Sequence, residues 1–346
     1  AVPLPRDRPL WKTILVDRGA SPTAILFRVH HALADGFALL AQLLSICDDP
    51  DDTHAQAPST HGTRKTGVVG QGLAAARLVS LPPDPHTTLK NRLGVEKSVA
   101  WSRAYPLEDV KLAAHAMSAT INDVLVAAVA GALGRYLRNN GESPHDVRAM
   151  VPVNVRRVTS AELGNRFGLV IVALLVGIRD VRARLDEVKR RMDKLKATPE
   201  GWIAVGLLSV LGWLPRRLEA LDARFFATKS SLVLTNVPGP RARLHLGGVP
   251  IERIIFWVPE AARLGLGVSI FSYAGEVQVG VVADVRVAPH PEALVAALDE
   301  EMRGLVGDAP QTDARSSAQA PMGARADTDT TRPSRTKTSD AKARPL

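Results

Sequence analysis

The sequence predicts an α/β fold in which helices and strands form a sandwich. Two observations carry this prediction. Short apolar, β-branched runs typical of strands occur among longer segments whose apolar residues recur at helical spacing. The spacings of a GxGxxG loop and of a P-loop are absent, so a nucleotide-binding sheet of either type is not indicated. Because 46% of the 346 residues are apolar, the chain can bury a core.

The first elements are expected before residue 48. Thr23–Val29 is a short apolar run and predicts a buried strand, and Phe37–Cys47 has the wide apolar face of a helix. The composition then changes over residues 48–98, where acidic residues are followed by Pro, Ser, Thr and Gly around one apolar island. We interpret residues 48–98 as a crossover linker between a short N-terminal lobe, residues 1–47, and a larger second lobe.

Residues 99–306 are predicted to form this second lobe. Helices are expected over Leu107–Met117, Ile121–Leu137, Arg179–Lys196, Trp202–Leu221 and Pro291–Leu305. Strands are expected over Ala149–Val155, Leu169–Ile178, Ser231–Val237, Ile251–Val258, Gly267–Ser272 and Glu276–Val285. The last two strands should form a hairpin with its turn at Ala274-Gly275. Residues 307–346 have no periodicity and predict a disordered tail.

Composition narrows the class of partner. The net charge of +9 suits the phosphates of coenzyme A, anionic lipid or nucleic acid, although a solvated basic surface explains it equally well. Aromatic residues make up only 4% and do not alternate with basic runs, so no nucleic-acid partner is expected. The single cysteine, Cys47, fits a reducing compartment. The most apolar stretch, Gly201–Leu214, is too short to span a bilayer, so we expect a soluble or peripheral protein.

A pair of histidines, His30 and His31, follows the first predicted strand and precedes the first predicted helix. A neutral imidazole there could accept the proton of an alcohol that attacks a thioester, because its pKa lies near working pH. The pair could also be ordinary core or surface residues, and Asp35 could simply cap the helix that begins at Gly36. A metal site is less well supported, because adjacent histidines point in different directions and no third ligand has suitable spacing.

Further motifs accompany the histidines in a fixed order. They are Pro9-Leu10-Trp11, His30-His31-Ala32-Leu33-Ala34-Asp35-Gly36, Asn122-Asp123, Gly164-Asn165-Arg166-Phe167-Gly168 and Asn236-Val237-Pro238-Gly239-Pro240. The second resembles the HHxxxDG signature of the coenzyme A-dependent acyltransferase superfamily. The others resemble elements of the wax ester synthase/diacylglycerol acyltransferase family, in that family's order. The resemblance implies a fold of two chloramphenicol-acetyltransferase-like lobes with the site between them.

The resemblance also implies roles for the residues of the histidine motif. His31 matches the general base of the family, and His30 is a neighbour that shapes the site. Asp35 matches an aspartate that turns away from the base and stabilises the loop. Replacement of Asp35 would therefore affect folding as much as chemistry. Gly36 leaves room where substrate must approach.

The Asn122-Asp123 motif allows two interpretations. Asn122 could donate a hydrogen bond to negative charge that develops on the reacting carbonyl, and Asp123 would lie beside it in the substrate site. Thr120 and Asp123 also have the spacing of a capping box at the start of a helix. The Asn236–Pro240 element predicts a tight Pro-Gly turn after a strand, and Trp11 is expected in the core.

The implied activity is O-acyl transfer without a cofactor, with acyl-CoA as substrate. The acceptor would be diacylglycerol, which gives triacylglycerol, or a long-chain alcohol, which gives a wax ester; other acceptors remain an alternative. Gly201–Leu221 could line an apolar channel for the acyl chain or pack as ordinary core. A cytoplasmic location is expected, with possible contact to the inner face of the membrane or to lipid droplets.

The N-terminal part departs from the family pattern. Members of the family carry a longer segment before the Pro9-Leu10-Trp11 motif, so the first lobe, residues 1–47, is expected to be incomplete. Its strand would then present an open edge. This departure supports an alternative function, a shortened homologue that binds lipid or a partner without catalysis.

Overall fold

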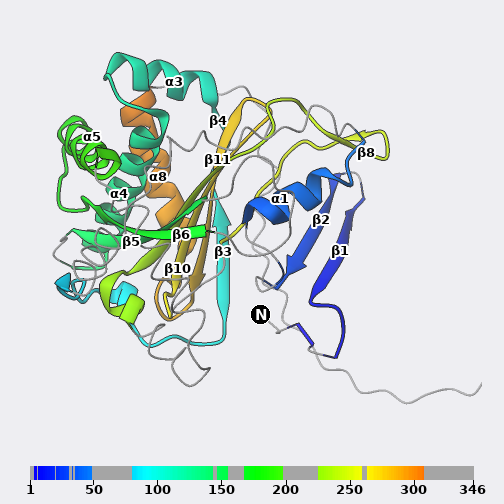
Figure 1. The fold of residues 1–346 in the computed structure, drawn as a ribbon, viewed down its shortest axis with the longest axis horizontal. Coiled ribbons are helices and arrows are strands. Elements are labelled where there is room, and N and C mark those ends of the chain that lie inside the picture. Colours follow the sequence, from blue (N-terminus) through cyan, green and yellow to red (C-terminus); the bar gives the residue numbers. More distant parts are fainter. Residues whose placement is uncertain are drawn as a thin grey trace, which may run out of the picture. The chain divides into compact units, whose positions relative to one another are not determined.

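A seven-stranded mixed sheet organises most of the residues that the structure describes (Figure 1). This computed structural model describes residues 4–5, 7–19, 21–30, 33, 36–48, 80–142, 146–154, 167–197, 225–258 and 263–307. The strands lie in the order β3-β11-β10-β7-β5-β6, and β4 pairs with β11. Their bounds are β3 Lys97–Trp101, β4 Tyr105–Pro106, β5 Val147–Asn154, β6 Phe167–Leu174, β7 Leu232–Pro238, β10 Leu266–Tyr273 and β11 Glu276–Asp284.

The centre of the sheet is parallel and its flanks are antiparallel. Strand β7 pairs in parallel with β10 on one side and with the start of β5 on the other, whereas β10–β11, β11–β3 and β5–β6 are antiparallel pairs. The β10–β11 hairpin closes at Ala274 and Gly275, which have φ values of 48° and 82°. A two-residue turn of this kind requires positive φ at both positions, so the predicted turn is confirmed.

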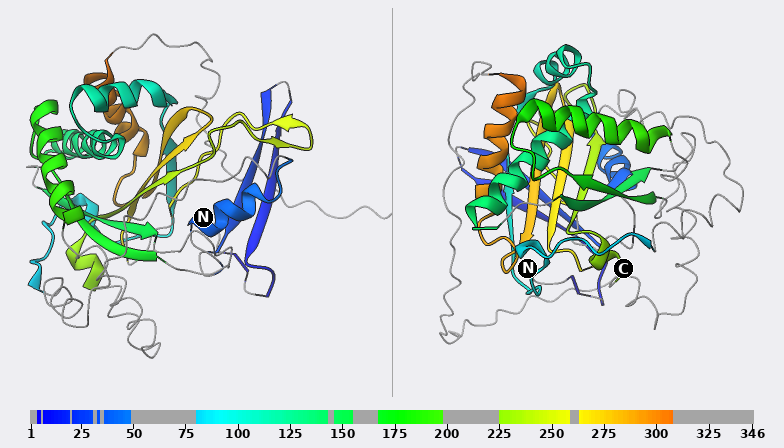
Figure 2. Two further views of the ribbon diagram at one scale, coloured as in Figure 1. Left: turned by 45° about the horizontal axis from the view of Figure 1, so that its top comes forward. Right: turned by 90° about the vertical axis from the view of Figure 1, so that its left-hand side faces the viewer.

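Four helices cover one face of the sheet: α3 Leu107–Ala116, α4 Ile121–Asn139, α5 Val181–Ala197 and α8 Pro291–Val306 (Figures 1 and 2). Helix α4 is the innermost, because every residue from Asp123 to Gly134 is buried and the helix contacts α3, α5 and α8. Gly131 permits this packing: a Cβ there would collide with the side chains of Arg184 and Glu301. Those two side chains form a buried ion pair between α5 and α8.

No single helix among the described residues is long and apolar enough to cross a membrane. Helices α3 and α4 reach that length and composition only when they are taken together, and they meet at a bend of 96°. The apolar residues of α4 belong to the core that also includes the inner faces of β10 and β11. Burial against this sheet therefore accounts for the apolar character of α4.

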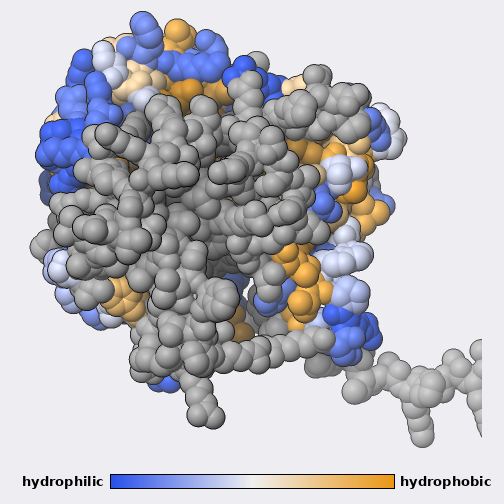
Figure 3. All heavy atoms as spheres, in the orientation of Figure 1, coloured by the Kyte–Doolittle hydropathy of each residue, from blue (hydrophilic) through white to orange (hydrophobic). Residues whose placement is uncertain are grey.

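The N-terminal residues form a separate two-stranded antiparallel sheet, β1 Trp11–Arg18 and β2 Ser21–Val29, which is followed by helix α1, Gly36–Leu44. The strand predicted over Thr23–Val29 is confirmed, but the prediction that it is buried is wrong. Its apolar side chains are exposed because β2 pairs only with β1 in the part of the chain that the structure describes. Trp11, which was expected in the core, begins β1 with 58% of its surface exposed. Figure 3 shows apolar surface over the hairpin of β1 and β2.

Most predicted elements of the second lobe are confirmed, with ends shifted by a few residues. The strand predicted over Ile251–Val258 is wrong, since these residues form no ladder. They pack instead through side chains and isolated hydrogen bonds: Trp257 Nε1 donates to the carbonyl of Ala100 at 3.3 Å, and Ser269 Oγ donates to that of Phe256 at 2.5 Å. Strands β1, β3, β4, β8 (His245–Leu246) and β9 (Val249–Pro250) were not predicted.

Residues 80–96, the second half of the predicted linker, are hydrogen-bonded to the sheet region. The Asp84 carboxylate accepts from the backbone N–H of Arg148 at 3.1 Å and from Ser231 Oγ. Lys90 Nζ donates to the carbonyls of Ala227 at 2.6 Å and Ser230 at 2.9 Å. The first half of the linker, the helix predicted over Trp202–Leu221 and the predicted tail beyond Gly307 lie outside the described residues.

Candidate active site

Helix α1 begins at Gly36, the last residue of the histidine motif, and its apolar face docks onto the sheet region. The buried side chains of Leu40, Leu44 and Cys47 form one apolar cluster with Val237, Leu244, Phe271 and Tyr273. Val237 belongs to β7, and Phe271 and Tyr273 belong to β10. The helix that follows the histidine motif therefore packs against the C-terminal ends of two central strands.

Asp48 fixes the chain just beyond α1. Its backbone N–H donates to the carbonyl of His245 at 2.9 Å, and its carboxylate accepts from the backbone N–H groups of Gly247 at 3.0 Å and Gly248 at 2.7 Å. Both glycines have positive φ, 60° and 75°, so the turn between β8 and β9 presents adjacent N–H groups to one anion. The hydrogen bonds from Gly248 and Gly247 hold the pKa of Asp48 below its usual value.

The histidine motif itself is described only in part. His30 follows β2; its backbone N–H donates to the carbonyl of Leu10 at 2.8 Å, and its own carbonyl accepts from Leu33 at 3.0 Å. The His30 side chain is exposed. No heavy atom of the described residues lies within 4 Å of the position that a Cβ of Gly36 would occupy. His31 and Asp35 lie outside the described residues, so their predicted roles stay predictions.

Asn122 and Asn236 meet at the start of helix α4. Asn236 Nδ2 donates to Asn122 Oδ1 at 3.1 Å, across 114 positions of sequence. Asn236 is the one exposed residue of β7, whose other residues are buried or half-buried. Two motifs that are far apart in the sequence therefore share a hydrogen bond. Asn236 was not among the predicted site residues; the available signal was an asparagine, a poor strand former, inside an apolar strand.

Asp123 closes a capping box with Thr120. Its Oδ2 accepts from the Thr120 backbone N–H at 2.9 Å and from Thr120 Oγ1 at 2.7 Å, while Thr120 Oγ1 accepts from the Asp123 backbone N–H at 3.2 Å. The capping interpretation is confirmed by this geometry. The Asp123 side chain is fully buried, and its Oδ1 has no hydrogen-bond partner within the described part of the chain. Direct contact between Asp123 and substrate remains a prediction.

The Asn236–Pro240 element does not form the tight turn that was predicted. The chain continues beside β10: the Gly239 backbone N–H donates to the carbonyl of Ser272 at 2.9 Å, and the Pro240 carbonyl accepts from Ala274 at 3.0 Å. A Cβ at Gly239 would lie 2.4 Å from both the Phe271 ring and the Ser272 carbonyl oxygen. Glycine is needed here because the backbone approaches β10 closely.

These contacts place α1 and the start of α4 at the same end of β7, on opposite faces of the sheet, and this end is the candidate active site. Val237 packs in one cluster with the apolar face of α1, whereas the side chain of Asn236 points to the other face of the sheet and contacts Asn122 in the first turn of α4. The N-terminus of a helix and amide N–H groups both favour negative charge. The arrangement can therefore stabilise an oxyanion, if a base is supplied by the histidine motif that precedes α1.

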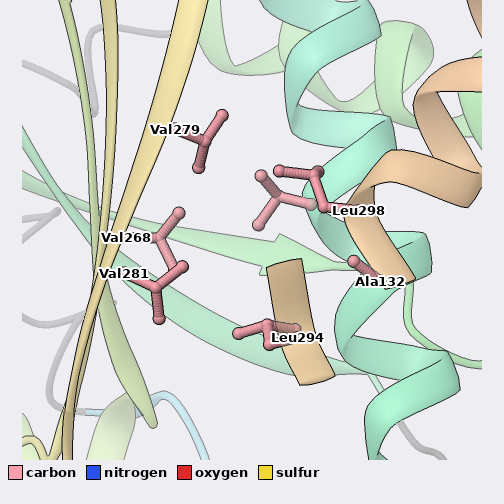
Figure 4. Close-up of a pocket in the computed structure, with 7 residues that line it drawn as sticks. Ala132, Val268, Val279, Val281, Leu294 and Leu298 are labelled. Carbon is pink, nitrogen blue, oxygen red and sulfur yellow. The ribbon is translucent and has the colours of Figure 1, made fainter. Parts of the chain in front are cut away.

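A small cavity of about 10 Å³ lies elsewhere, between α4, α8 and the strands β10 and β11 (Figure 4). Its lining is apolar and consists of Val129, Ala132, Val268, Val279, Val281, Leu294 and Leu298. A volume of this size holds about one water molecule. It is a packing gap in the core and does not account for an acyl channel; the segment predicted to line that channel, Gly201–Leu221, lies outside the described residues.

Solved structures define the class of this fold. The chain is similar to the wax ester synthase/diacylglycerol acyltransferase from Marinobacter aquaeolei VT8, with a TM-score of 0.63, 22% identity, and coverage of 88% of this chain and 74% of that one. It is also similar to the first condensation domain of the CDA synthetase, with a TM-score of 0.53 and 18% identity over 89% of this chain and 69% of the other. The predicted acyltransferase-type α/β fold is confirmed.

Family models and sequence relatives then identify the family. The model of the wax ester synthase/diacylglycerol acyltransferase catalytic domain matches residues 1–82, and that of the WS/DGAT C-terminal domain matches residues 163–305. Two Mycobacterium tuberculosis proteins, provisionally named diacylglycerol O-acyltransferases, are 27% and 29% identical and are matched over 69% and 75% of their lengths; the matches cover 88% and 87% of this chain. The chain belongs to the wax ester synthase/diacylglycerol acyltransferase family.

Proposed function

We propose that this chain transfers a fatty acyl group from acyl-CoA to the hydroxyl of diacylglycerol or of a long-chain alcohol. Membership of the family supports acyl transfer, and the names of its relatives support these acceptors. The structural observation that carries the proposal is the hydrogen bond between Asn236 and Asn122, at the end of β7 against which α1 also packs. A pair of amides able to bind a carbonyl oxygen therefore lies at the same end of β7 as the helix that follows the histidine motif.

In the proposed mechanism His31 is the general base. It takes the hydroxyl proton of the acceptor as the oxygen attacks the thioester carbonyl, and a tetrahedral intermediate forms with its negative charge on the former carbonyl oxygen. The intermediate collapses as the carbon–sulfur bond breaks, and the proton held by His31 passes to the departing coenzyme A sulfur. His30 shapes the site, Asp35 holds the loop, and Gly36 leaves space for substrate, as the family resemblance implies.

Asn122 is proposed to stabilise the intermediate. Its side chain lies in the first turn of α4, where the helix dipole favours negative charge, and its amide can donate two hydrogen bonds. One well-placed donor to an oxyanion contributes roughly 3 kcal/mol to transition-state stabilisation. Asp123, beside it, holds the first turn through the capping box.

The proposed partners and cellular location follow from the chemistry of the substrates. The net charge of +9 favours approach of the coenzyme A phosphates and of anionic headgroups. We place the protein in the cytoplasm, with peripheral contact to a membrane or lipid droplet where apolar acceptors reside. No cofactor besides the substrate acyl-CoA takes part in this mechanism.

The test is release of coenzyme A from palmitoyl-CoA with diacylglycerol or hexadecanol, followed with a thiol reagent. The His31→Ala variant should lose activity by about 100-fold or more, because general-base catalysis of this kind contributes roughly 10²–10⁴-fold. His115→Ala, which removes an exposed histidine at the end of α3, is the matched control and should keep wild-type activity. Equal activity in His31→Ala and wild type would contradict the proposed base. Acyl-CoA binding by folded wild-type protein without turnover would favour the non-catalytic alternative.

A further inference from the structure

Asn236 occupies a place in β7 where its residue type needs an explanation. The strand reads LVLTNVP, its neighbours Thr235 and Val237 are buried, and Asn236 alone is exposed. Asparagine is unfavourable in strands because its side chain competes for backbone hydrogen bonds and packs poorly. The side chain of Asn236 contacts Asn122 rather than its own backbone. This contact therefore accounts for the asparagine.

An amide side chain has two different ends. Asn122 Oδ1 accepts from Asn236 Nδ2 at 3.1 Å, so the oxygen end of Asn122 is directed to Asn236. Turning the Asn122 amide alone by 180° would place two donors against each other, which is unfavourable. In the arrangement of the structure, both N–H groups of Asn122 are directed away from Asn236. Asn122 then presents donors, and not its oxygen, to a ligand.

The base on which Asn236 is mounted is rigid. In the parallel ladder Asn236 is aligned with Ile270 of β10, a buried residue. The next residue, Val237, packs in the apolar cluster with Leu40 and Leu44 of α1. A side chain mounted on a central strand whose backbone is fixed by its neighbours is suitable for orienting a second side chain.

We propose that Asn236 is a positioning residue that orients the Asn122 amide so that its N–H groups donate to the carbonyl oxygen of the thioester. This inference rests on the proposed function. In the transfer step the oxygen–carbon bond forms, the carbonyl electrons move onto its oxygen and return as the carbon–sulfur bond breaks. The hydroxyl proton passes through the base to the thiol of coenzyme A. Asn122 contacts only the carbonyl oxygen, and Asn236 acts only through Asn122.

The test uses an isosteric exchange. Asn236→Asp replaces the donor with an acceptor of the same shape, so Asn122 must turn its Nδ2 toward residue 236 and its oxygen outward. We expect kcat to fall by about 10-fold to 100-fold with KM changed by less than about twofold, because the lost donor acts on transition-state charge. Asn236→Ala, which leaves Asn122 free to adopt either orientation, should lower kcat by less, about fivefold. Asn91→Asp makes the same chemical change in an exposed loop and serves as the control.

A double-variant cycle separates positioning from a structural role. In the Asn122→Ala background, Asn236→Asp should lower kcat by less than about twofold, since its effect passes through Asn122. Equal effects of Asn236→Asp in both backgrounds would overturn the proposal, as would a larger effect of Asn236→Ala than of Asn236→Asp.

A second measurement does not depend on turnover. In spectra of protein labelled with ¹⁵N at asparagine, the side-chain amide signals of Asn122 should shift in Asn236→Asp and stay in place in Asn91→Asp. Absence of turnover in folded wild-type protein would remove the proposed function, and the orientation would then be judged on these signals alone. Unchanged Asn122 signals in Asn236→Asp would overturn the positioning role.

Discussion

Two strands of similar composition, β2 and β10, differ completely in burial. Strand β10 is buried along nearly its whole length, because it lies between β7 and β11 and under the helical layer. In β2, by contrast, Ile25, Leu26 and Phe27 are each 38–42% exposed, and the strand pairs only with β1 among the described residues. An apolar strand sequence therefore predicts a strand but not its burial, which depends on neighbours in the fold.

The same contrast in burial divides the described residues into two parts. The scaffold is the seven-stranded sheet with α3, α4, α5 and α8, and the attached part is β1, β2 and α1. The seven-stranded sheet and its helices contain most of the buried residues. The motif-bearing helix α1 reaches this scaffold through a few apolar side chains and the Asp48 hydrogen bonds. The scaffold supplies Asn122 and Asn236 in fixed places, and α1, which follows the histidine motif, packs against the same end of β7. Changes in the scaffold should thus affect stability most, and changes in the attached part should affect it least.

The largest stability loss is expected on removal of Glu301. Its carboxylate pairs with Arg184 inside the helical layer, where both side chains are almost fully buried, and also with Arg135. Glu301→Ala leaves the Arg184 guanidinium buried without its counter-ion, which should lower the free energy of unfolding by about 3–5 kcal/mol. Glu300→Ala removes the neighbouring exposed partner of Arg135 and should change it by about 1 kcal/mol or less. Denaturant unfolding of the two variants measures the difference, and equal losses would contradict it.

The contrast in burial can be tested directly with a matched pair of leucines. Leu133 in α4 is fully buried, and Leu15 in β1 is 66% exposed. Leu133→Ala should lower the free energy of unfolding by about 2–5 kcal/mol through lost burial and the cavity it leaves. Leu15→Ala should change it by about 0.5 kcal/mol or less. A comparable loss in Leu15→Ala would show that the hairpin is covered in solution.

The elements that could be predicted from the sequence are those with a local, repeated pattern. Helices α4 and α8 and the β10–β11 hairpin follow from periodicity and turn chemistry alone. The segment Ile251–Val258 was wrongly predicted as a strand, because its apolar residues pack against the sheet without joining a ladder. The contact between Asn122 and Asn236 could not be predicted from the sequence, since 114 positions separate the two residues and no local pattern connects them. The histidine motif was found by resemblance, and the role of His31 stays a prediction.

A smaller effect is expected at the start of α4, where two variants separate capping from chemistry. Asp123→Ala removes the reciprocal bonds with Thr120 and should lower the free energy of unfolding by about 0.5–2 kcal/mol. Asp123→Asn keeps an oxygen for the Thr120 donors and should retain most of the stability. Thermal unfolding of both variants checks this order. A loss of acyl transfer in a stable Asp123→Asn variant would give the carboxylate a role beyond the cap.

The smallest effect is expected at Asp48, which joins the attached part to the scaffold. Because its pKa is lowered in the folded protein, its contribution is fully present above the unfolded value of about 3.9 and is lost as pH falls through the lower folded value. Near neutral pH the contact should be insensitive to pH. Hydrogen exchange at Gly247 and Gly248 should be slower in wild type than in Asp48→Ala at pH 7. Identical exchange in the two proteins would mean that the contact is not formed.

The central claim, transfer to an alcohol by a histidine base, is tested most directly by the fate of a labelled acyl chain. Radiolabelled palmitoyl-CoA is incubated with the protein and diacylglycerol, and triacylglycerol and free fatty acid are separated and counted. Triacylglycerol as the main product, formed by wild type and by His115→Ala but not by His31→Ala, is the predicted result. Free fatty acid formed equally with and without diacylglycerol would contradict the claim, because the acceptor would then be water.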